Sequence, residues 1–349
     1  MILISMASFA AEELPISKAV ALALEYSPFM KAMTAGSQVA REKIGEAQAM
    51  NRAKIAVGVT DSTTDSPMLA FGSKLNQQRI TAADFDPARL NDPDYTNNLQ
   101  AGLQVVQPLY LGGMDRHAVS AARKGLQAQE LDREQATQDV IFRTIEAYLN
   151  VILARESVSV AERAVEASKE SLRNTSAAYE ANQAVQSDVL QAQVHHSQNE
   201  ETLLRMQNQY RLAREGLATV LGVTTVEEYR LNMPFLQQEC QTCKEEAGEL
   251  LKEALAERSD YRKLSHQMEA AGHMEKMARG TVRPHVAIGT RLEHNSRDLS
   301  RSGHANALFF ARMDWNIGDG GEARHKARGA KWQAAQLADF MKAKEDQIR

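Results

Sequence analysis

The chain has 349 residues, of which 43% are hydrophobic and 25% charged, with a net charge of −4 and a mean hydropathy of −0.43. No apolar run reaches the length of about 18 residues that a transmembrane helix needs. Membrane-spanning strands of about 10 residues are not excluded, because their alternating polarity averages out in such a composition. The absence of a strongly basic balance argues against nucleic acid as a partner.

Residues 1–10 are a short apolar segment that ends in Ser8, Phe9 and Ala10. Small residues at the first and third of these positions are typical of a signal-peptide cleavage site, here before Ala11. A basic region at the start of the segment is lacking, so an ordinary apolar N-terminus is the alternative. We therefore expect residues 1–10 to be the remnant of a signal peptide.

Two short helices are predicted next. The first is amphipathic and runs from Ile16 to Tyr26, and the second begins at Pro28 and ends near Ala53. A brief strand follows at about 55–60. Residues 61–97 are polar and rich in turn-forming residues, which predicts a long loop between two strands, with a disordered linker as the alternative.

A strand-to-helix junction follows this loop. Residues 98–107 alternate between apolar and polar, as in a strand with one apolar face. Pro108 lacks the amide donor of a sheet ladder, and Gly112 and Gly113 can adopt positive φ without a Cβ clash. We expect the sheet to end at this point and a helix to begin.

A helical hairpin is predicted over 114–222. Residues from Met114 to Asn182 contain no proline, so they can form a helix of roughly 100 Å with coiled-coil spacing of its apolar positions. A short break and a second helix that ends at Gly222 require the chain to turn back. Asn182 suits a left-handed helix end. Apolar residues of the second helix should pack on the first: Leu190, Val194, Met206, Tyr210, Leu217 and Leu221.

The junction recurs later in the chain. Gly320 and Gly321 follow another alternating strand, and the strand at 55–60 has a counterpart at 286–293. This indicates a duplication, with a first repeat at 11–231, an inter-repeat segment at 232–249 and a second repeat at 250–349. The second repeat ends about 80 residues before the equivalent of Gly222, so we expect a complete protein of about 430 residues.

Few residues indicate chemistry. Cys240 and Cys243 lie between the repeats and, in an oxidising compartment, predict a local disulfide, with free thiols or a metal as alternatives. His117 and His325 start helices and more simply belong to helix surfaces than to a metal site. No catalytic triad, paired-carboxylate or phosphate-loop pattern is present, so the sequence predicts neither an enzyme nor a cofactor.

Three sequence patterns carry a family resemblance. They are Q-P-L-x-x-G-G-x-x-R from Gln107, A-L-x-x-S-P-F from Ala23 and the helix end at residues 216–222. Their order and duplication resemble the TolC family of outer membrane efflux proteins. The resemblance implies a mainly α fold with transmembrane β-strands, in which helical hairpins form a coiled-coil α-barrel. Four β-strands per protomer would contribute to a trimeric, 12-stranded β-barrel.

The same resemblance implies the function. The protein would be the outer-membrane channel-tunnel of a tripartite efflux or type I secretion system, a passive conduit with its helical part in the periplasm. Its partners would be two further copies, a periplasmic adaptor (membrane fusion) protein, an inner-membrane transporter and outer-membrane lipid. The hairpin turn would dock on the adaptor, or else merely close the hairpin, and it comprises Asn182, Gln183, Ala184, Val185, Gln186, Ser187 and Asp188.

The strands support this reading independently. Four strands cannot close a barrel, and open sheet edges are not tolerated in lipid, so other copies must complete the sheet. The strand near 306–317 should present Phe309, Met313 and Trp315 to lipid, as Leu99, Leu103 and Val105 would in the earlier strand. Residues between them would line the lumen: Gln100, Gln104, Arg312 and Asp314. The alternative is a periplasmic coiled-coil scaffold that conducts nothing, but such a scaffold has no use for these strands.

Overall fold

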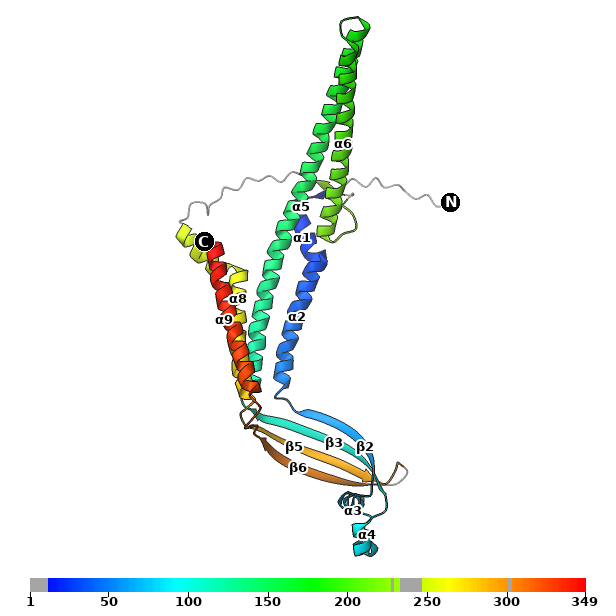
Figure 1. Cartoon of the computed structure of the whole chain (residues 1–349), viewed down its shortest axis with the longest axis vertical. Coiled ribbons are helices and arrows are strands. Elements are labelled where there is room, and N and C mark those ends of the chain that lie inside the picture. Colours follow the sequence, from blue (N-terminus) through cyan, green and yellow to red (C-terminus); the bar gives the residue numbers. More distant parts are fainter. Residues whose placement is uncertain (1–11, 227–228, 233–246, 300–302) are drawn as a thin grey trace, which may run out of the picture. The chain divides into compact units, whose positions relative to one another are not determined.

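The computed structural model describes residues 12–226, 229–232, 247–299 and 303–349. The predicted signal segment 1–10 and the cysteine pair Cys240 and Cys243 lie outside these ranges. The chain forms two compact units (Figure 1), the first from Met1–Gln38 with Gln129–Arg262 and the second from Val39–Ala128 with Lys263–Gln347. Within the described ranges, no helix is both long and apolar enough to cross a membrane.

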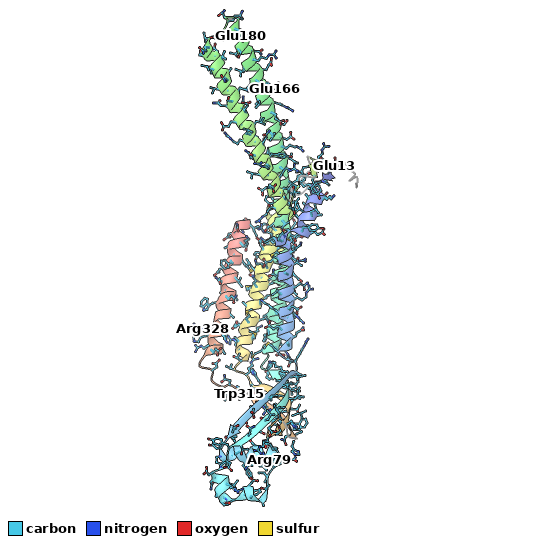
Figure 2. The ribbon with its side chains drawn as sticks, turned by 90° about the vertical axis from the view of Figure 1, so that its right-hand side faces the viewer. Glu13, Arg79, Glu166, Glu180, Trp315 and Arg328 are labelled. Carbon is cyan, nitrogen blue, oxygen red and sulfur yellow. The ribbon has the colours of Figure 1, made fainter. Side chains whose placement is uncertain are left out.

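A helical hairpin is formed by α5 (Met114–Glu180) and α6 (Gln186–Leu221), and from Gln129 onward it belongs to the first unit. Figure 2 shows Glu180 near its far end. Asn182 has φ 57°, so the left-handed helix end predicted there is confirmed. α6 ends before Gly222 as predicted, and this glycine has φ 71°. The return helix begins at Gln186, where the Val185 amide donates to the Asp188 carboxylate at 3.3 Å.

The core of this unit surrounds Tyr148. β1 (Glu12–Leu14) pairs in parallel with β4 (Tyr229–Leu231), and α1 (Ile16–Tyr26) begins two residues after β1. The fully buried Tyr148 hydroxyl donates to the Leu14 carbonyl oxygen at 2.8 Å and accepts from the Asn232 amide at 3.0 Å. Burial raises the pKa of this phenol. The short sheet is thus tied to α5 by one side chain.

The packing predicted for α6 is right at one end only. Leu217 and Leu221 are fully buried in the core of the first unit, and Tyr210 packs against it. Leu190 and Val194 instead have exposed fractions of 54% and 57%, so the expectation that they pack on α5 is wrong. Among the residues that the structure describes, α5 is the one helix beside α6 near the turn, and it covers one side of α6.

The second unit holds an antiparallel sheet with the order β2, β3, β5, β6 (Figure 1). The strands are β2 (Lys54–Thr64), β3 (Thr96–Leu111), β5 (His285–Ser296) and β6 (His304–Asp314). The first strand is longer than predicted, because polar residues from Asp61 to Thr64 continue the ladder with residues 96–99 of β3. Among the described residues, neither β2 nor β6 has a strand on its outer side.

The prediction that residues 61–97 form one loop is wrong. Residues 65–95 connect the strands and contain α3 (Pro67–Asn76), η1 (Ala82–Phe85) and α4 (Pro87–Asn91). Pro67 and Pro87 start their helices, a position where the missing amide costs nothing. Lys74 and Asp84 form an ion pair at 3.0 Å, and the Phe71 and Phe85 rings pack edge to face. The connection is therefore a small folded element at the end of the sheet.

Helices lead into and out of the strands. α2 (Pro28–Ala49) precedes β2 and ends four residues earlier than predicted, while α8 (Ser259–Gly280) precedes β5. α9 (Glu322–Ile348) follows β6 as α5 follows β3. α2 and α8 each have 22 residues, and α1 and α7 (Ala247–Glu257) each have 11.

Candidate functional site: a two-faced sheet and a helical hairpin turn

One face of the four-stranded sheet is apolar. Residues directly opposite in an antiparallel ladder point to the same face, and Leu103 lies opposite both Val57 and Leu292. Thr290 likewise joins Val105 to Phe309 across β5. The predicted common face of the two alternating strands is confirmed by this register. Asp61, Thr290 and His294 share this face with its apolar side chains, which are Ile55, Val57, Val59, Leu99, Ala101, Leu103, Val105, Val286, Ile288, Leu292, Ala307, Phe309, Ala311 and Met313.

This apolar face is exposed to solvent in the single chain. Val57 and Phe309 have exposed fractions of 77% and 78%. A contiguous apolar surface that spans four strands is far more than a water-soluble monomer normally exposes, so it requires an apolar surrounding or a partner.

The opposite face of the sheet is polar. The Arg291 guanidinium lies 3.7 Å from the Glu293 carboxylate and donates to the Gln104 amide oxygen at 3.4 Å. Arg312 pairs with Asp314 at 2.7 Å on β6. Several charged and amide side chains lie on this face, which also carries Val106, Leu308 and Phe310: Lys54, Gln100, Gln104, Arg291, Glu293, Arg312 and Asp314. Such a face suits contact with water and passing solutes.

One residue of the first junction, Pro108, does not act as the stop signal that the sequence predicts. Gly112 and Gly113 have φ 64° and 85°, as predicted. Pro108 does not end the sheet: β3 continues to Leu111, and its register with β5 shifts between Pro108 and Tyr110. A proline is accommodated at such an irregularity because a ladder hydrogen bond is already interrupted there.

Gly112 is fixed by a close backbone approach. A Cβ on Gly112 would meet the Gly280 carbonyl oxygen and lie 3.0 Å from the Arg283 Cβ. The Arg283 guanidinium donates to the Gly112 carbonyl oxygen at 3.2 Å. Only glycine fits this point, where the start of α5 lies against the end of α8.

The second junction has the same positive φ angles as the first, but an aspartate side chain caps the helix that follows it. Gly320 and Gly321 have φ 66° and 92°, as predicted. The Asp319 carboxylate accepts from the Gly321 and Ala323 amides at 2.9 and 2.7 Å, and these bonds lower the pKa of Asp319. Near this end of β6, the indole of Trp315 donates to the Val282 carbonyl oxygen at 3.1 Å and remains 55% exposed. Figure 2 shows Trp315 where the helices meet the sheet and Arg79 toward the other end of the sheet.

A buried amide network was missed by the sequence analysis. The Gln77 amide donates to the Asn98 side-chain oxygen at 2.8 Å and to the Ser296 carbonyl at 3.2 Å, and Asn98 donates to Asn295 at 3.0 Å. These side chains are nearly inaccessible to solvent, at 1–8% exposure. Asn98 and Asn295 belong to the polar face, so Gln77 fastens the end of α3 to that face. A lone glutamine in a polar loop gives no signal of this role.

The hairpin turn is exposed. Val185 is 60% exposed, Ala184 is half-buried, and the polar residues around them are open to solvent: Asn182, Gln183, Gln186, Ser187 and Asp188. The turn therefore presents one apolar side chain within a polar rim.

His117 is part of a histidine pair. Its Nδ1 lies 3.5 Å from Nδ1 of His273 in α8. Burial, followed by the charges of His273, Lys276 and Arg283, lowers the pKa of His117. His325 is exposed at the start of α9. Among the described residues, no three His, Cys, Asp or Glu side chains gather as a metal site.

Comparison with known proteins identifies the family and the fold of the chain. The family model for outer membrane efflux proteins matches residues 19–223. VceC of Vibrio cholerae is 16% identical with a TM-score of 0.72, over 95% of this chain and 75% of VceC. The CmeC channel of Campylobacter jejuni is 18% identical with a TM-score of 0.75, over 94% and 67%. The MtrE channel of Neisseria gonorrhoeae is 18% identical with a TM-score of 0.71, over 99% and 74%. No curated protein sequence matches.

The fold, a four-stranded antiparallel sheet in a chain with a long helical hairpin, is that of these outer membrane channel structures. The family match covers more than half of the chain, so the protein belongs to the outer membrane efflux protein family. The predicted family is confirmed. This is a family of efflux channels and not of enzymes.

Proposed function

We propose that the protein is the outer-membrane channel-tunnel of a tripartite efflux or type I secretion system. Three copies would join their sheets into one 12-stranded β-barrel with the apolar face toward lipid and the polar face toward the lumen. The observation that carries this proposal is the sheet itself, since it has two chemically distinct faces and a free edge on each side. Free edges and an exposed apolar face are both removed by closure in a membrane.

The experiment is conductance with a stoichiometry measurement. The protein expressed from its gene is extracted from outer membranes, crosslinked in detergent and added to a planar lipid bilayer. We expect a trimer and discrete conductance steps. A monodisperse monomer that stays in the aqueous phase and passes no current would favour the periplasmic scaffold instead.

We also propose that the turn from Asn182 to Asp188 docks on a periplasmic adaptor, which would connect the channel to an inner-membrane transporter. The support is the exposed Val185 within a polar rim at the end of a hairpin. Docking would remove the exposed apolar surface of Val185 from water, while the polar residues around it could remain at a hydrated rim.

The test replaces Val185 with Asp and, as a matched control, with the isosteric Thr. The exposed turn tolerates either change in the fold, but a carboxylate cannot be buried unpaired in an apolar contact. We expect Val185→Asp to keep normal trimer yield and lose efflux in cells, while Val185→Thr keeps both. Normal efflux with Val185→Asp would show that the turn only closes the hairpin.

A further inference from the structure

A cavity lies on the polar face of the sheet, at the end where the strands meet the helices (Figure 1). It has a volume of about 410 Å³ and is lined from all four strands. In the ladders Lys54 lies opposite Val106, and Ala287 lies opposite both Pro108 and Arg312, so these side chains point to one face. The cavity therefore belongs to the surface that would line the lumen.

The floor of this cavity is apolar. It is formed by four short side chains without polar atoms, those of Ala56, Val106, Pro108 and Ala287, of which the last three are half-buried. Short side chains leave the floor below the longer polar side chains that surround it. Apolar surface that remains open to water within a polar face favours contact with an apolar ligand.

The sides of the cavity carry positive charge. The Arg312 guanidinium pairs with Asp314 through Nε at 2.7 Å, which leaves its terminal nitrogens and its planar face outside that bond. Lys54 is exposed and forms no ion pair with any residue that the structure describes. His285 donates from Nε2 to the Gly280 carbonyl oxygen at 3.3 Å. Two cations and one carboxylate thus line the cavity, and its net charge is +1 while His285 is neutral.

The cavity spans the width of the sheet. Lys54 lies on β2 and Arg312 on β6, the first and fourth strands. Neighbouring strands are about 4.8 Å apart, so the backbones of β2 and β6 are separated by roughly 14 Å. Both side chains are long and border the same cavity, so the space between their charged groups suits one or two fused aromatic rings.

We propose that this cavity binds organic anions with an aromatic body. The Lys54 ammonium would hold the anionic group, because no described carboxylate already neutralises it. The aromatic rings would cover the floor at Val106 and Ala287 and lie against the Arg312 guanidinium, a contact that arginine favours.

The cavity would serve as a subsite that such anions occupy on their way along the lumen. This role rests on the proposed channel. Binding itself does not, because every lining residue belongs to a single chain.

The charges farther along the same face are already balanced. Arg291 lies 3.7 Å from the Glu293 carboxylate and donates to the Gln104 amide oxygen at 3.4 Å. At the cavity, by contrast, the ammonium of Lys54 stands beside an apolar floor without a carboxylate partner among the described residues. An aromatic anion should therefore bind beside Lys54 in preference to Arg291.

The first experiment measures binding by equilibrium dialysis of the detergent-solubilised protein, with detergent alone as the blank. The probe is naphthalene-2-sulfonate, which carries a permanent negative charge on two fused rings. Methanesulfonate has the same anionic group without the rings, and 2-naphthylmethylammonium has the rings with the opposite charge. We expect one naphthalene-2-sulfonate per chain and at least about tenfold weaker binding of the other two probes. Equally tight binding of either one would overturn the proposed ligand class.

Two variants locate the bound anion. Lys54→Gln and Arg291→Gln each remove one positive charge from an exposed side chain of the same face. We expect Lys54→Gln to weaken naphthalene-2-sulfonate binding about tenfold, whereas Arg291→Gln should weaken it less than about twofold, because salt screens an exposed charge outside the cavity. Lys54→Arg keeps the charge and should keep the affinity. An equal loss with Lys54→Gln and Arg291→Gln would overturn the site.

The second experiment separates the cavity from the channel. In a planar lipid bilayer, naphthalene-2-sulfonate should reduce the conductance of the protein, and Lys54→Gln should require about ten times more of it for the same reduction. Binding in dialysis without any current would overturn the proposed channel and leave the ligand class supported. A current without binding would overturn the cavity proposal alone, and binding that leaves the current unchanged would overturn the role in the lumen.

Discussion

Gly112→Ala should destabilise the second unit, and the structure gives the magnitude. The residue has φ 64°, and an alanine in this left-handed region costs about 1–2 kcal/mol. The added Cβ also overlaps the Gly280 carbonyl oxygen and approaches the Arg283 Cβ to 3.0 Å. Backbone atoms cannot move aside cheaply, and overpacking of this kind costs about 1–3 kcal/mol. We expect a total of about 2–5 kcal/mol.

Two matched glycines separate the strain from the overlap. Gly113 has φ 85° but meets only the Arg283 guanidinium at 3.8 Å, so Gly113→Ala should cost only the backbone strain of about 1–2 kcal/mol. Gly125 lies inside α5 with no atom within 4 Å of its Cβ. Gly125→Ala should stabilise the helix by about 0.5–1 kcal/mol, because alanine is the better helix former.

The assay is thermal unfolding in detergent, followed by circular dichroism of the helices. We expect the midpoints to fall in the order Gly125→Ala, unchanged protein, Gly113→Ala and Gly112→Ala, with the extremes separated by on the order of 10 °C. Equal midpoints for Gly112→Ala and Gly113→Ala would refute the reasoning from the close approach to Gly280.

Three further predictions follow from buried polar groups. Tyr148→Phe leaves the Leu14 carbonyl and Asn232 amide without their partner, so it should cost about 1–3 kcal/mol, measured as a lower unfolding midpoint of the first unit. Gln77→Ala should speed amide hydrogen exchange in residues 65–95 and leave the hairpin unchanged, whereas uniform protection would contradict an anchoring role. His117 has a lowered pKa, so the unfolded state binds its proton more readily; stability should fall as pH drops below about 6.5, and His117→Gln should reduce that loss in an acid titration.

The sequence was sufficient for elements whose signals are local. Asn182 and Gly222 mark helix ends through backbone conformations that few residues adopt, and both positions are as predicted. The alternation of residues 98–107 fixed the two faces of the sheet, because a period of two leaves no choice of side. The positive φ angles of the glycine pairs at both junctions were likewise predictable from the local sequence.

Features that depend on distant partners could not be predicted. Pro108 was expected to end the sheet, but the pairing of β3 with β5 continues past it through a register shift. No local sequence pattern predicts that shift. Gln77 acquires its role from Asn98 and Ser296, which lie far away in the sequence. Leu190 and Val194 have the spacing of packed residues, yet whether they are covered depends on how many helices surround the hairpin.

The pair of hydrogen bonds from Gln107 and Trp315 bears on how such duplications are recognised. The Gln107 amide donates to the Asn51 carbonyl oxygen at 2.9 Å, and the Trp315 indole donates to the Val282 carbonyl oxygen at 3.1 Å. Each acceptor lies three residues before the first strand of its own repeat, although an amide and an indole have little in common beyond an N–H donor. Residue identity has diverged while the bond has persisted. Aligning the two halves by amino-acid similarity scores this position as a mismatch, whereas the shared hydrogen bond supports the duplication. Other chains with this architecture should carry any side chain with an N–H of that reach at the equivalent position.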